Sequence, residues 1–376
     1  MTGPLIVLAT GGTAGHVFPA EALAAELAAR GCRLALFTDR RGGAFGGRLN
    51  EIDTYRIRAG GIAGKGPVDR LMSTAEIGLG TMQAWQLLKQ LRPAAAIGFG
   101  GYASVPTMTA ATFAGMRTAI HEQNAVLGRA NRLLAGRVNH IATAFKEVRS
   151  VPAGAEAKVV RTGMPVRPMI GAVRDRVYPP LDGDSPLNIL VFGGSQGAHA
   201  LSQVVPQALG MLDPRFKDRL RVVQQCREED IAVVRGQYGS FGIDADLRPF
   251  FDDIPERYAA AHLVICRSGA STVAELTAIG RPAIMVPYPH AVDDHQAFNA
   301  HALDDAGGGW LMPETSFAAD ALATRLDSLF SLPKLLEKAA AAAKAAGVPD
   351  AVATLADMVM GMVPGNGDAE PRRAAA

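Results

Sequence analysis

The chain has 376 residues, a formal net charge of +2 and a hydrophobic content of 48%. These values exclude an intrinsically disordered protein and predict a globular protein of two or three domains with an ample core. They also argue against a nucleic-acid-binding protein, which needs an excess of positive charge to neutralise phosphates.

The cysteines and the N-terminus indicate a cytosolic protein. Cys32, Cys226 and Cys266 lie in or beside apolar runs and form no Cys-x-x-Cys pair, which predicts reduced core thiols and no metal cluster. An apolar strand begins within a few residues of Met1 and is soon followed by glycine, so no signal peptide is expected. No segment approaches the roughly 20 uninterrupted apolar residues of a membrane-spanning helix.

The first predicted unit is a strand, a glycine turn and a helix. Residues 5–9 (LIVLA) are a continuous apolar strand, residues 10–16 are a glycine-rich turn, and residues 19–30 form a helix. Such a unit can cradle a phosphate at the helix N-terminus. Neither this turn nor residues 60–66 has the glycine, lysine and serine or threonine spacing of a P-loop, so an ATPase is disfavoured.

A glycine- and arginine-rich stretch, residues 39–69, is expected to include a mobile loop. The helix at residues 70–91 has two possible interpretations. Its helical spacing of apolar residues favours a core helix. Alternatively, part of the helix surface is exposed, has basic flanks and lies against anionic lipid. This surface is made by Ile77, Leu79, Met82 and Trp85.

Two patterns at strand ends point to ligand binding. Gly98, Gly100 and Ala103 follow a strand and fit G-x-G-x-x-A, but the acidic residue of a dinucleotide site is missing after the next strand. That next strand runs instead into HEQN at residues 121–124. Ligands bind at the carboxyl ends of strands in an open α/β sheet, so we favour a functional block over a simple turn.

The chain then repeats its opening pattern. Strands at residues 140–143 and 159–160 precede a charged, proline-rich stretch at residues 171–186, which marks a domain junction. A new apolar strand at residues 187–192 leads into GGSQGA, which has the same form as the first glycine turn. The sequence therefore predicts two similar α/β halves.

The second half contains the strand, turn and helix at residues 263–279, followed by a strand at residues 283–286. Ser268 and the amides of residues 270–272 are expected to present the positive end of a helix dipole to a phosphate. Glu275, one turn into the helix, is placed to accept hydrogen bonds from a ribose diol. The alternative is that this turn only caps the helix and Glu275 is a solvated surface residue.

The remaining acidic residues and the C-terminal part suggest simpler roles. Asp244, Asp246, Asp293 and Asp294 resemble metal-binding acids of metal-dependent sugar transferases, but we expect them to lie in turns. Alanine-rich helices are expected at residues 316–330, 332–346 and 351–360.

Six motifs occur in the order seen in the MurG family of UDP-N-acetylglucosamine transferases, which make lipid II of peptidoglycan. They are GGTAGHVFP at 11–19, GGY at 100–102, HEQN at 121–124, GGSQG at 193–197, RSGA at 267–270 with Glu275, and Gln296 with Asn299. The chain resembles this family up to about residue 360. It departs from the family at Ala14, often a glycine, and at His295, often a glutamine.

The resemblance implies an α/β, GT-B fold with two doubly wound Rossmann-like domains facing a cleft. Residues 1–165 would form the acceptor and membrane-side domain, and residues 166–345 the UDP-GlcNAc-binding domain. Residues 346–362 would be a helix returning to the first domain, and residues 363–376 a disordered tail.

The resemblance also implies site residues. Glu275 would hold the ribose, the backbone of Phe251 the uracil, and Gln296 and Asn124 the sugar. The remaining donor contacts would come from Thr13, Ala14, Gly15, Arg167, Ser195, Ala270, Ser271, Thr272 and Val273. His16, Tyr102, His121 and Glu122 would lie on the acceptor side.

The implied reaction is a direct, inverting displacement at the anomeric carbon by the 4-hydroxyl of lipid I. Helix amides stabilise the departing UDP, so no metal or other cofactor is expected. His16 is the first candidate for the general base and Glu122 the alternative. The expected partners are UDP-GlcNAc, lipid I and an anionic membrane surface at the cytoplasmic face of the bacterial inner membrane, with no nucleic acid.

Two rival functions remain open at this point. Another UDP-sugar enzyme of the same architecture, such as a UDP-GlcNAc 2-epimerase or a small-aglycone transferase, would share the glycine turns. From a different class, a nucleotide-binding module or NAD-dependent dehydrogenase is disfavoured by the missing acidic residue after the second strand.

Overall fold

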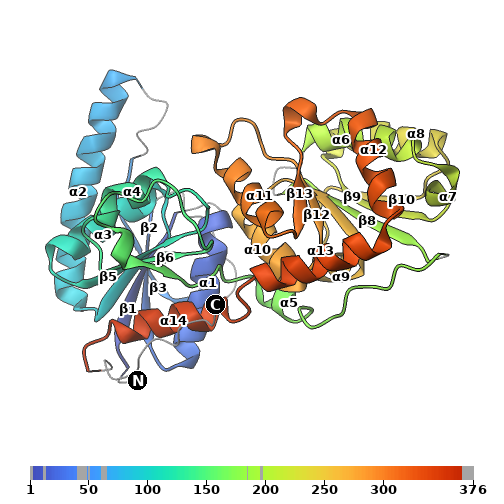
Figure 1. The fold of residues 1–376 in the computed structure, drawn as a ribbon. Helices are drawn as coiled ribbons and strands as arrows, with labels where there is room; N and C mark the ends of the chain where they lie inside the picture. The colour runs from blue at the N-terminus through green and yellow to red at the C-terminus, as the bar shows by residue number, and fades with distance from the viewer. Residues whose placement is uncertain are drawn as a thin grey trace. The chain divides into compact units, whose positions relative to one another are not determined.

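The computed structural model describes residues 3–11, 14–39, 49, 51–60, 66–183, 185–194 and 198–365. The chain divides into two compact units, which are taken separately here (Figure 1). Unit 1 comprises Met1–Arg167 with Asp350–Ala376, and unit 2 comprises Pro168–Pro349. The sequence placed the corresponding divisions after residues 165 and 345.

Unit 1 is built on a parallel sheet with the strand order β3-β2-β1-β4-β5-β6-β7. Its apolar strands are buried on both faces, as expected for a sheet covered by helices on each side. The strands are β1 (Leu5–Ala9), β2 (Arg33–Thr38), β3 (Asp53–Arg56), β4 (Ala95–Gly98), β5 (Arg117–Glu122), β6 (His140–Thr143) and β7 (Val159–Arg161).

Strand β3 lies within the stretch of residues 39–69, for which the sequence predicted a mobile loop but no strand. Its sequence, DTYR, is polar and mostly exposed, so it carries no apolar strand signal. It pairs in parallel with β2, and Tyr55 packs on Phe37 with 5.2 Å between ring centroids. An edge strand of this kind is fixed by its neighbour rather than by its own pattern.

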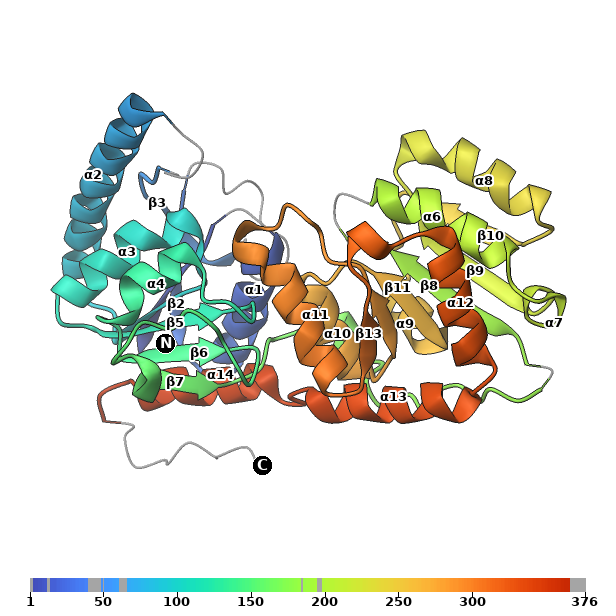
Figure 2. The same cartoon turned by 45° about the horizontal axis from the view of Figure 1, so that its top comes forward.

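Helices cover both faces of this sheet (Figure 2). The helices are α1 (Ala14–Ala29), α2 (Pro67–Leu91), α3 (Gly101–Phe113), α4 (Arg129–Ala135) and α14 (Ala351–Gly361). Side chains of α1 and α14 pack in one hydrophobic cluster, and side chains of α2, α3 and α4 pack in another. Alternate residues of β1 belong to the two clusters, because successive side chains of a strand point to opposite faces.

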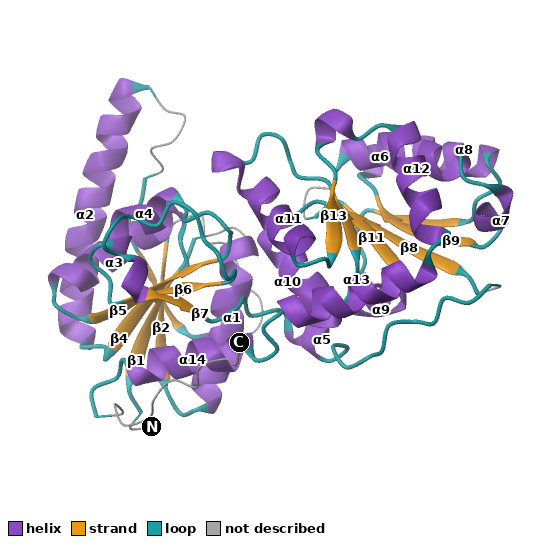
Figure 3. Ribbon diagram, viewed as in Figure 1, coloured by secondary structure: helices purple, strands orange, loops and turns teal. Residues whose placement is uncertain are grey.

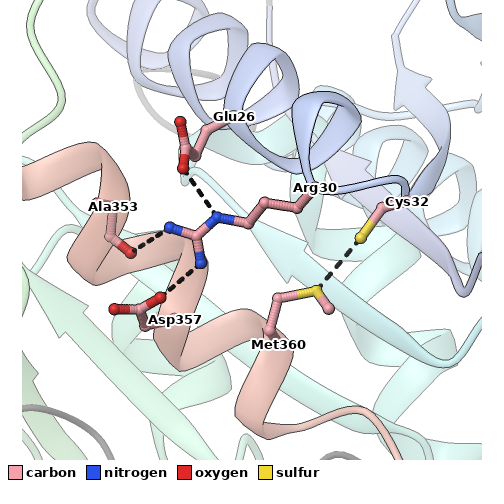
Figure 4. Close-up of polar contacts among 6 residues, drawn as sticks. All are labelled: Glu26, Arg30, Cys32, Ala353, Asp357 and Met360. Carbon is pink, nitrogen blue, oxygen red and sulfur yellow. Dashed lines mark hydrogen bonds and ion pairs between the residues drawn. The ribbon is translucent and has the colours of Figure 1, made fainter.

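Helix α14 is held on α1 by both core packing and polar contacts (Figure 4). Leu355 and Val359 are fully buried in the cluster shared with α1. Arg30 donates hydrogen bonds to Glu26, at 2.8 Å, and to Asp357, at 2.5 Å. Cys32 Sγ lies 3.2 Å from Met360 Sδ. The end of the chain therefore completes the core of the unit that begins it.

Helix α2 exposes part of its apolar surface. Ala84 and Leu88 are buried in the cluster with α3, but Leu79, Met82 and Trp85 are 46%, 55% and 39% exposed. The interpretation of α2 as wholly a core helix is therefore wrong for these three residues. None of the helices in the described part of the chain is both long and apolar enough to cross a membrane.

Unit 2 repeats the doubly wound order in the parallel sheet β10-β9-β8-β11-β12-β13 (Figure 3). Its strands are β8 (Leu187–Phe192), β9 (Leu220–Gln225), β10 (Ala245–Arg248), β11 (Leu263–Cys266), β12 (Ala283–Met285) and β13 (Gly309–Leu311). Its helices are α5 (Pro168–Gly171), α6 (His199–Gly210), α7 (Pro214–Lys217), α8 (Ile231–Ser240), α9 (Ile254–Ala260), α10 (Ala270–Ile279), α11 (His295–Asp305), α12 (Ala319–Phe330) and α13 (Pro333–Ala346). The predicted α/β class with two doubly wound Rossmann-like domains is confirmed.

The buried Arg281 ties the ends of two helices of unit 2 together. Only 1% of this residue is exposed, and burial lowers the pKa of its guanidinium to about 10. Its guanidinium donates hydrogen bonds to the backbone oxygens of Val177, Tyr258, Ala259, Ile279 and Gly280. Tyr258 and Ala259 lie in the last turn of α9, and Ile279 and Gly280 end α10. The cation is therefore satisfied by two helix C-termini, which carry partial negative charge.

We predict that core packing, rather than the Arg30 ion pairs, holds α14 in place. Leu355→Ala should lower the free energy of unfolding by about 2–5 kcal/mol, because it leaves a cavity at a fully buried position. Asp357→Ala should cost less than about 1 kcal/mol, because the side chain of Asp357 is 46% exposed. The chain has two tryptophans, Trp85 in unit 1 and Trp310 in unit 2, so urea denaturation in a Trp310→Phe background reports on unit 1. Equal losses for the two variants would contradict this prediction.

Candidate functional site

The reversal of strand order marks one candidate site in each unit. In unit 2 the order reverses between β8 and β11, which are neighbours in the sheet but not in the chain. In unit 1 it reverses between β1 and β4. Ligands of doubly wound folds bind outside the carboxyl ends of the strands at such a point. The motifs predicted at the glycine turns follow these four strands.

The turn between β11 and α10 is fixed to the start of α11. Ser268 Oγ donates to the backbone oxygen of Gln296 at 2.8 Å, and Asn299 Nδ2 donates to the backbone oxygen of Ser268 at 3.1 Å. Ser268 and Asn299 are both fully buried. This corrects the expectation that the Ser268 hydroxyl is presented to an anion: the hydroxyl holds the turn together.

Gln296 is oriented by the loop after β12. Its Oε1 accepts a hydrogen bond from the backbone amide of Tyr288 at 2.9 Å. The amide nitrogen of Gln296 is therefore the end that can donate to a ligand. Gln296 is half-buried, which leaves part of it accessible.

The N-terminus of α10 supplies amides for an anion. Val273 N donates to Gly269 O, which is the first hydrogen bond inside the helix. The amides of Ala270, Ser271 and Thr272 precede that bond and carry the positive end of the helix dipole. Val273 itself is a correction to the prediction, because its amide is used inside the helix and its side chain is buried.

Glu275 is not the solvated surface residue of the alternative interpretation. Only 4% of it is exposed, on the second turn of α10. A carboxylate accepts hydrogen bonds, and a ribose diol supplies two donors.

The loop before α9 is held rigid by arginines around Phe251. Phe251 is buried, and the guanidinium carbons of Arg248 and Arg257 lie 5.5 and 5.3 Å from its ring centroid. Both arginines bond to Asp246 at 2.9 Å, and Arg257 also bonds to Asp253 at 2.8 Å. Asp246 lies in β10, not in a turn as predicted, and its charge is already neutralised by arginine.

Several predicted donor residues are only partly covered by the structure. Ser195 and Thr13 lie outside the described residues. Ala14 and Gly15 form the first turn of α1, so the alanine at position 14 adopts a helical conformation that any L-residue can reach. The guanidinium of Arg167 lies 5.7 Å from the ring of Phe18.

In unit 1, His16 packs directly on the backbone of the second glycine turn. Gly100 and Gly101 have φ angles of +84° and +70°. A Cβ atom at either position would lie 3.4 Å from the imidazole ring of His16. Glycine is favoured here by the positive φ angles, and the distance to the ring is that of ordinary van der Waals contact. The turn therefore fixes the position of the imidazole.

A chain of hydrogen bonds joins His16 to the buried end of β5. His16 Nδ1 lies 3.1 Å from Gln123 Oε1, and Gln123 Nε2 lies 3.0 Å from His121 Nδ1. His121 Nε2 lies 3.1 Å from Gly163 O. His121 is fully buried, and burial lowers its pKa to about 4, so it is neutral at neutral pH. His121 is linked to His16 through Gln123. The sequence had suggested that His121 lies on the acceptor side, but its ring is buried and does not face an acceptor.

Glu122 is committed to hydrogen bonds within the chain. It is 2% exposed, its Oε1 accepts from Asn124 N at 3.0 Å, and its Oε2 accepts from Gly128 N at 2.7 Å. Asn131 Nδ2 donates to the same Oε2 at 2.8 Å. Both oxygens of this carboxylate are therefore already engaged within the chain. The geometry therefore favours His16 over Glu122 for proton transfer.

Asn131 had no predicted role, but it lies on α4 and supports both His121 and Glu122. Its Nδ2 lies 3.2 Å from His121 O as well as 2.8 Å from Glu122 Oε2. Only the packing of α4 against β5 brings it there, so no local pattern reveals it. Of the other predicted acceptor-side residues, Tyr102 is half-buried in the first turn of α3. Asn124 Nδ2 donates to Glu122 Oε1 at 3.2 Å.

The segment before α11 has an unusual backbone. Asp293 and Asp294 have φ angles of +54° and +53°, which L-residues other than asparagine and aspartate rarely adopt. His295 Nδ1 lies 2.8 Å from Val292 O. This places His295 at the start of α11 with one ring nitrogen engaged locally. Such backbone strain clusters at functional sites.

The described residues contain no group of three or more histidine, cysteine or acidic side chains that could hold a metal ion.

The chain matches known glycosyltransferases over most of its length. Residues 6–143 match the glycosyltransferase family 28 N-terminal domain, and residues 188–355 match its C-terminal domain. It is 60% identical to the UDP-N-acetylglucosamine--N-acetylmuramyl-(pentapeptide) pyrophosphoryl-undecaprenol N-acetylglucosamine transferase of Paramagnetospirillum magneticum, covering 96% of this chain and 97% of that one. The transferase of the same name from Rhodospirillum rubrum is 56% identical, with 94% and 91% covered.

Solved structures give the same result. The crystal structure of Acinetobacter baumannii MurG has a TM-score of 0.78 and 31% identity, covering 95% of this chain and 99% of that one. The UDP-GlcNAc 2-epimerase of Neisseria meningitidis, bound to UDP-GlcNAc, has a TM-score of 0.61 and 12% identity, covering 94% and 98%. The second likeness is one of fold alone.

We predict that unit 1 loses stability in mild acid because of His121. Its pKa of about 4 in the folded chain lies below its ordinary value of 6.5. The stability it contributes is therefore fully present above pH 6.5 and is lost as the pH falls towards 4. From pH 7 to pH 5 this loss should be about 2 kcal/mol in urea denaturation followed by Trp85 fluorescence in the Trp310→Phe background. His121→Gln should show a smaller loss over the same interval. An equal loss would show that another group is responsible.

Proposed function

The chain belongs to glycosyltransferase family 28 and, within it, to the MurG transferases, and from this premise we propose that it converts lipid I to lipid II. The donor is UDP-GlcNAc, and the acceptor is the 4-hydroxyl of the muramic acid on undecaprenyl pyrophosphate. The observation that carries this proposal is the 60% identity, across 96% of the chain, to a transferase named for these substrates. The product belongs to peptidoglycan and cell-wall synthesis.

The switch point of unit 2 suits the donor. The amides of Ala270, Ser271 and Thr272 face an anion with a dipole equivalent to roughly half a charge, which suits the diphosphate. Glu275 would accept hydrogen bonds from the ribose hydroxyls, and the rigid loop at Phe251 would receive the uracil. Gln296 would donate its amide hydrogens to the sugar. Each of these contacts leaves the framework bonds of Ser268 and Asn299 intact.

The reaction follows from these groups and His16. The acceptor oxygen forms a bond to the anomeric carbon as the bond from that carbon to the β-phosphate oxygen breaks, so the configuration inverts. The electron pair of the broken bond leaves with UDP, whose charge the helix amides stabilise. The proton of the attacking hydroxyl passes to His16, a step that contributes about 10²- to 10⁴-fold in general-base catalysis. Neither a metal nor a cofactor has a step in this scheme.

The exposed apolar surface of α2 suits attachment to a membrane, where the acceptor lipid resides. Leu79, Met82 and Trp85 are exposed together, and Lys89 Nζ lies 3.6 Å from the Trp85 ring centroid. An exposed aromatic residue next to a lysine is typical of a membrane interface with anionic lipid. We therefore place the enzyme peripherally on the cytoplasmic face of the inner membrane.

We predict that the purified chain makes lipid II and releases UDP only when both UDP-GlcNAc and lipid I are present. Product can be followed by mass spectrometry and UDP release by a coupled assay. A UDP-GlcNAc 2-epimerase would change the donor without lipid I, and a small-aglycone transferase would accept simple alcohols. Either of those results would replace the proposed function.

A binding measurement tests the donor site. Glu275→Ala should weaken UDP binding, measured by calorimetry, by about 10- to 100-fold, as expected for lost hydrogen bonds to a charged group. Glu256→Ala is a matched control, because Glu256 is an exposed carboxylate on the neighbouring helix α9. Unchanged affinity in Glu275→Ala would remove the ribose from this position.

We predict that α2 binds anionic membranes. A Met82→Ser/Trp85→Ser variant should lose most of its binding to phosphatidylglycerol vesicles at low salt, because the apolar anchor is gone. Val233→Ser, at a 64% exposed apolar residue on α8, is the control and should bind as the unchanged protein does. Sedimentation with vesicles measures both. If the unchanged chain does not sediment with these vesicles, the membrane proposal fails.

A further inference from the structure

Gln123 lies between two histidines, one facing the candidate site and one fully buried. We infer that Gln123 is a positioning residue that holds His16 as the Nδ1–H tautomer, so that Nε2 is the nitrogen that takes the proton. This inference rests on the proposed function for its catalytic meaning. The tautomer itself follows from the hydrogen-bond geometry of unit 1 alone.

The orientation of the Gln123 amide is the first step. Its Nε2 is within hydrogen-bond distance of three acceptors: Phe99 O at 3.0 Å, His121 O at 3.1 Å and His121 Nδ1 at 3.0 Å. Rotating the amide by 180° would place its oxygen against two backbone oxygens, which repel it. The nitrogen therefore faces β4 and β5, and Oε1 faces His16.

His121 fixes the other end of the chain of bonds. Its Nε2 is 3.1 Å from Gly163 O, which only accepts, so Nε2 carries the hydrogen. Its Nδ1 then has a lone pair and accepts from Gln123 Nε2. Because His121 is fully buried and neutral, this arrangement does not change with a proton in the working pH range. The buried end is a fixed reference for the amide.

The consequence for His16 is a defined tautomer. Gln123 Oε1 can only accept, so His16 Nδ1 donates to it across 3.1 Å. In the neutral imidazole the lone pair is then on Nε2, which is the nitrogen that can act as a base. The backbone of Gly100 and Gly101 lies close to the same ring, because a Cβ at either position would be in van der Waals contact with it. When Nε2 takes a proton, Nδ1 keeps the same hydrogen bond.

The pairing of His16 with Gln123 differs from the pairing of a histidine with a carboxylate. The partner of His16 is a neutral amide, so no buried charge is needed to hold the ring. The oxygen of the Gln123 side chain determines the tautomer of His16, whereas the amide nitrogen only orients that oxygen. Substitutions that keep the oxygen should therefore keep the tautomer, and substitutions that remove it should not.

The tautomer can be measured without any substrate. The full chain labelled with ¹⁵N-histidine gives a long-range ¹H–¹⁵N correlation pattern that distinguishes the two neutral tautomers, and His16→Gln identifies the signals of His16. We expect the Nδ1–H pattern for His16 in the unchanged chain. The Nε2–H pattern would overturn the inference, whether or not the chain is a transferase.

Two variants of Gln123 test the catalytic consequence. Gln123→Met has a similar length but no acceptor, and should lower kcat by about 10- to 100-fold while KM for UDP-GlcNAc changes less than about twofold. Gln123→Glu keeps an oxygen towards His16, and with its carboxyl protonated the second oxygen donates to Phe99 O as the amide nitrogen does. This variant should retain the Nδ1–H pattern and a kcat closer to that of the unchanged chain than Gln123→Met does. A loss only in KM, or an unchanged kcat in a folded Gln123→Met, would overturn the positioning role.

The outcomes separate this inference from the proposed function. An unchanged chain that forms no lipid II would remove the proposed function, whereas the tautomer of His16 would still be decided by its spectrum. Circular dichroism shows whether Gln123→Met folds. If it does not, the spectrum of the unchanged chain and the kcat of Gln123→Glu decide, and a Gln123→Glu that folds but loses activity as His16→Gln does would contradict the inference.

Discussion

The reversal of strand order in each sheet is the constraint on which the candidate sites depend. At β1 and β4 in unit 1, and at β8 and β11 in unit 2, two neighbouring strands send their following helices to opposite faces. This separation leaves the turns after the strands uncovered by either helix. Glycine turns and helix N-termini gather there. The chemistry of the chain is therefore placed by topology before any side chain is chosen.

Several residues of the motifs make hydrogen bonds that hold the framework of the candidate sites together. Ser268 and Asn299 join the turn after β11 to α11, and Glu122 binds Asn131 and the backbone of the loop after β5. Buried polar groups must be satisfied, so each of these residues also depends on its partners. A residue type that is essential at such a position can therefore have a purely structural reason. Only burial and hydrogen-bond geometry distinguish residues that support the site from residues that are available to a ligand.

The sequence predicted the parts of the structure that have a local signal. Apolar runs such as residues 5–9 and 263–266 predicted buried parallel strands, and glycine turns predicted the switch points. It could not predict β3, whose polar residues pair only because β2 is beside them. It could not predict the contact of Asn131, on α4, with the carboxylate of Glu122 at the end of β5. Nor could it predict that the amide of Val273 is hydrogen-bonded inside α10. Those facts depend on tertiary contacts.

Arg281 sets a fixed spacing within unit 2. It joins the C-terminal ends of α9 and α10 by hydrogen bonds to their backbone oxygens. Helix α9 begins after the loop of Phe251, and α10 begins after the turn of Ser268. The two turns therefore precede helices that are joined at their C-terminal ends, so the turns do not move apart independently. The distance between the two turns limits the length of a ligand that contacts both. A molecule whose base and phosphates are too close together or too far apart cannot contact both turns. Arg281 therefore links the two turns through the opposite ends of their helices.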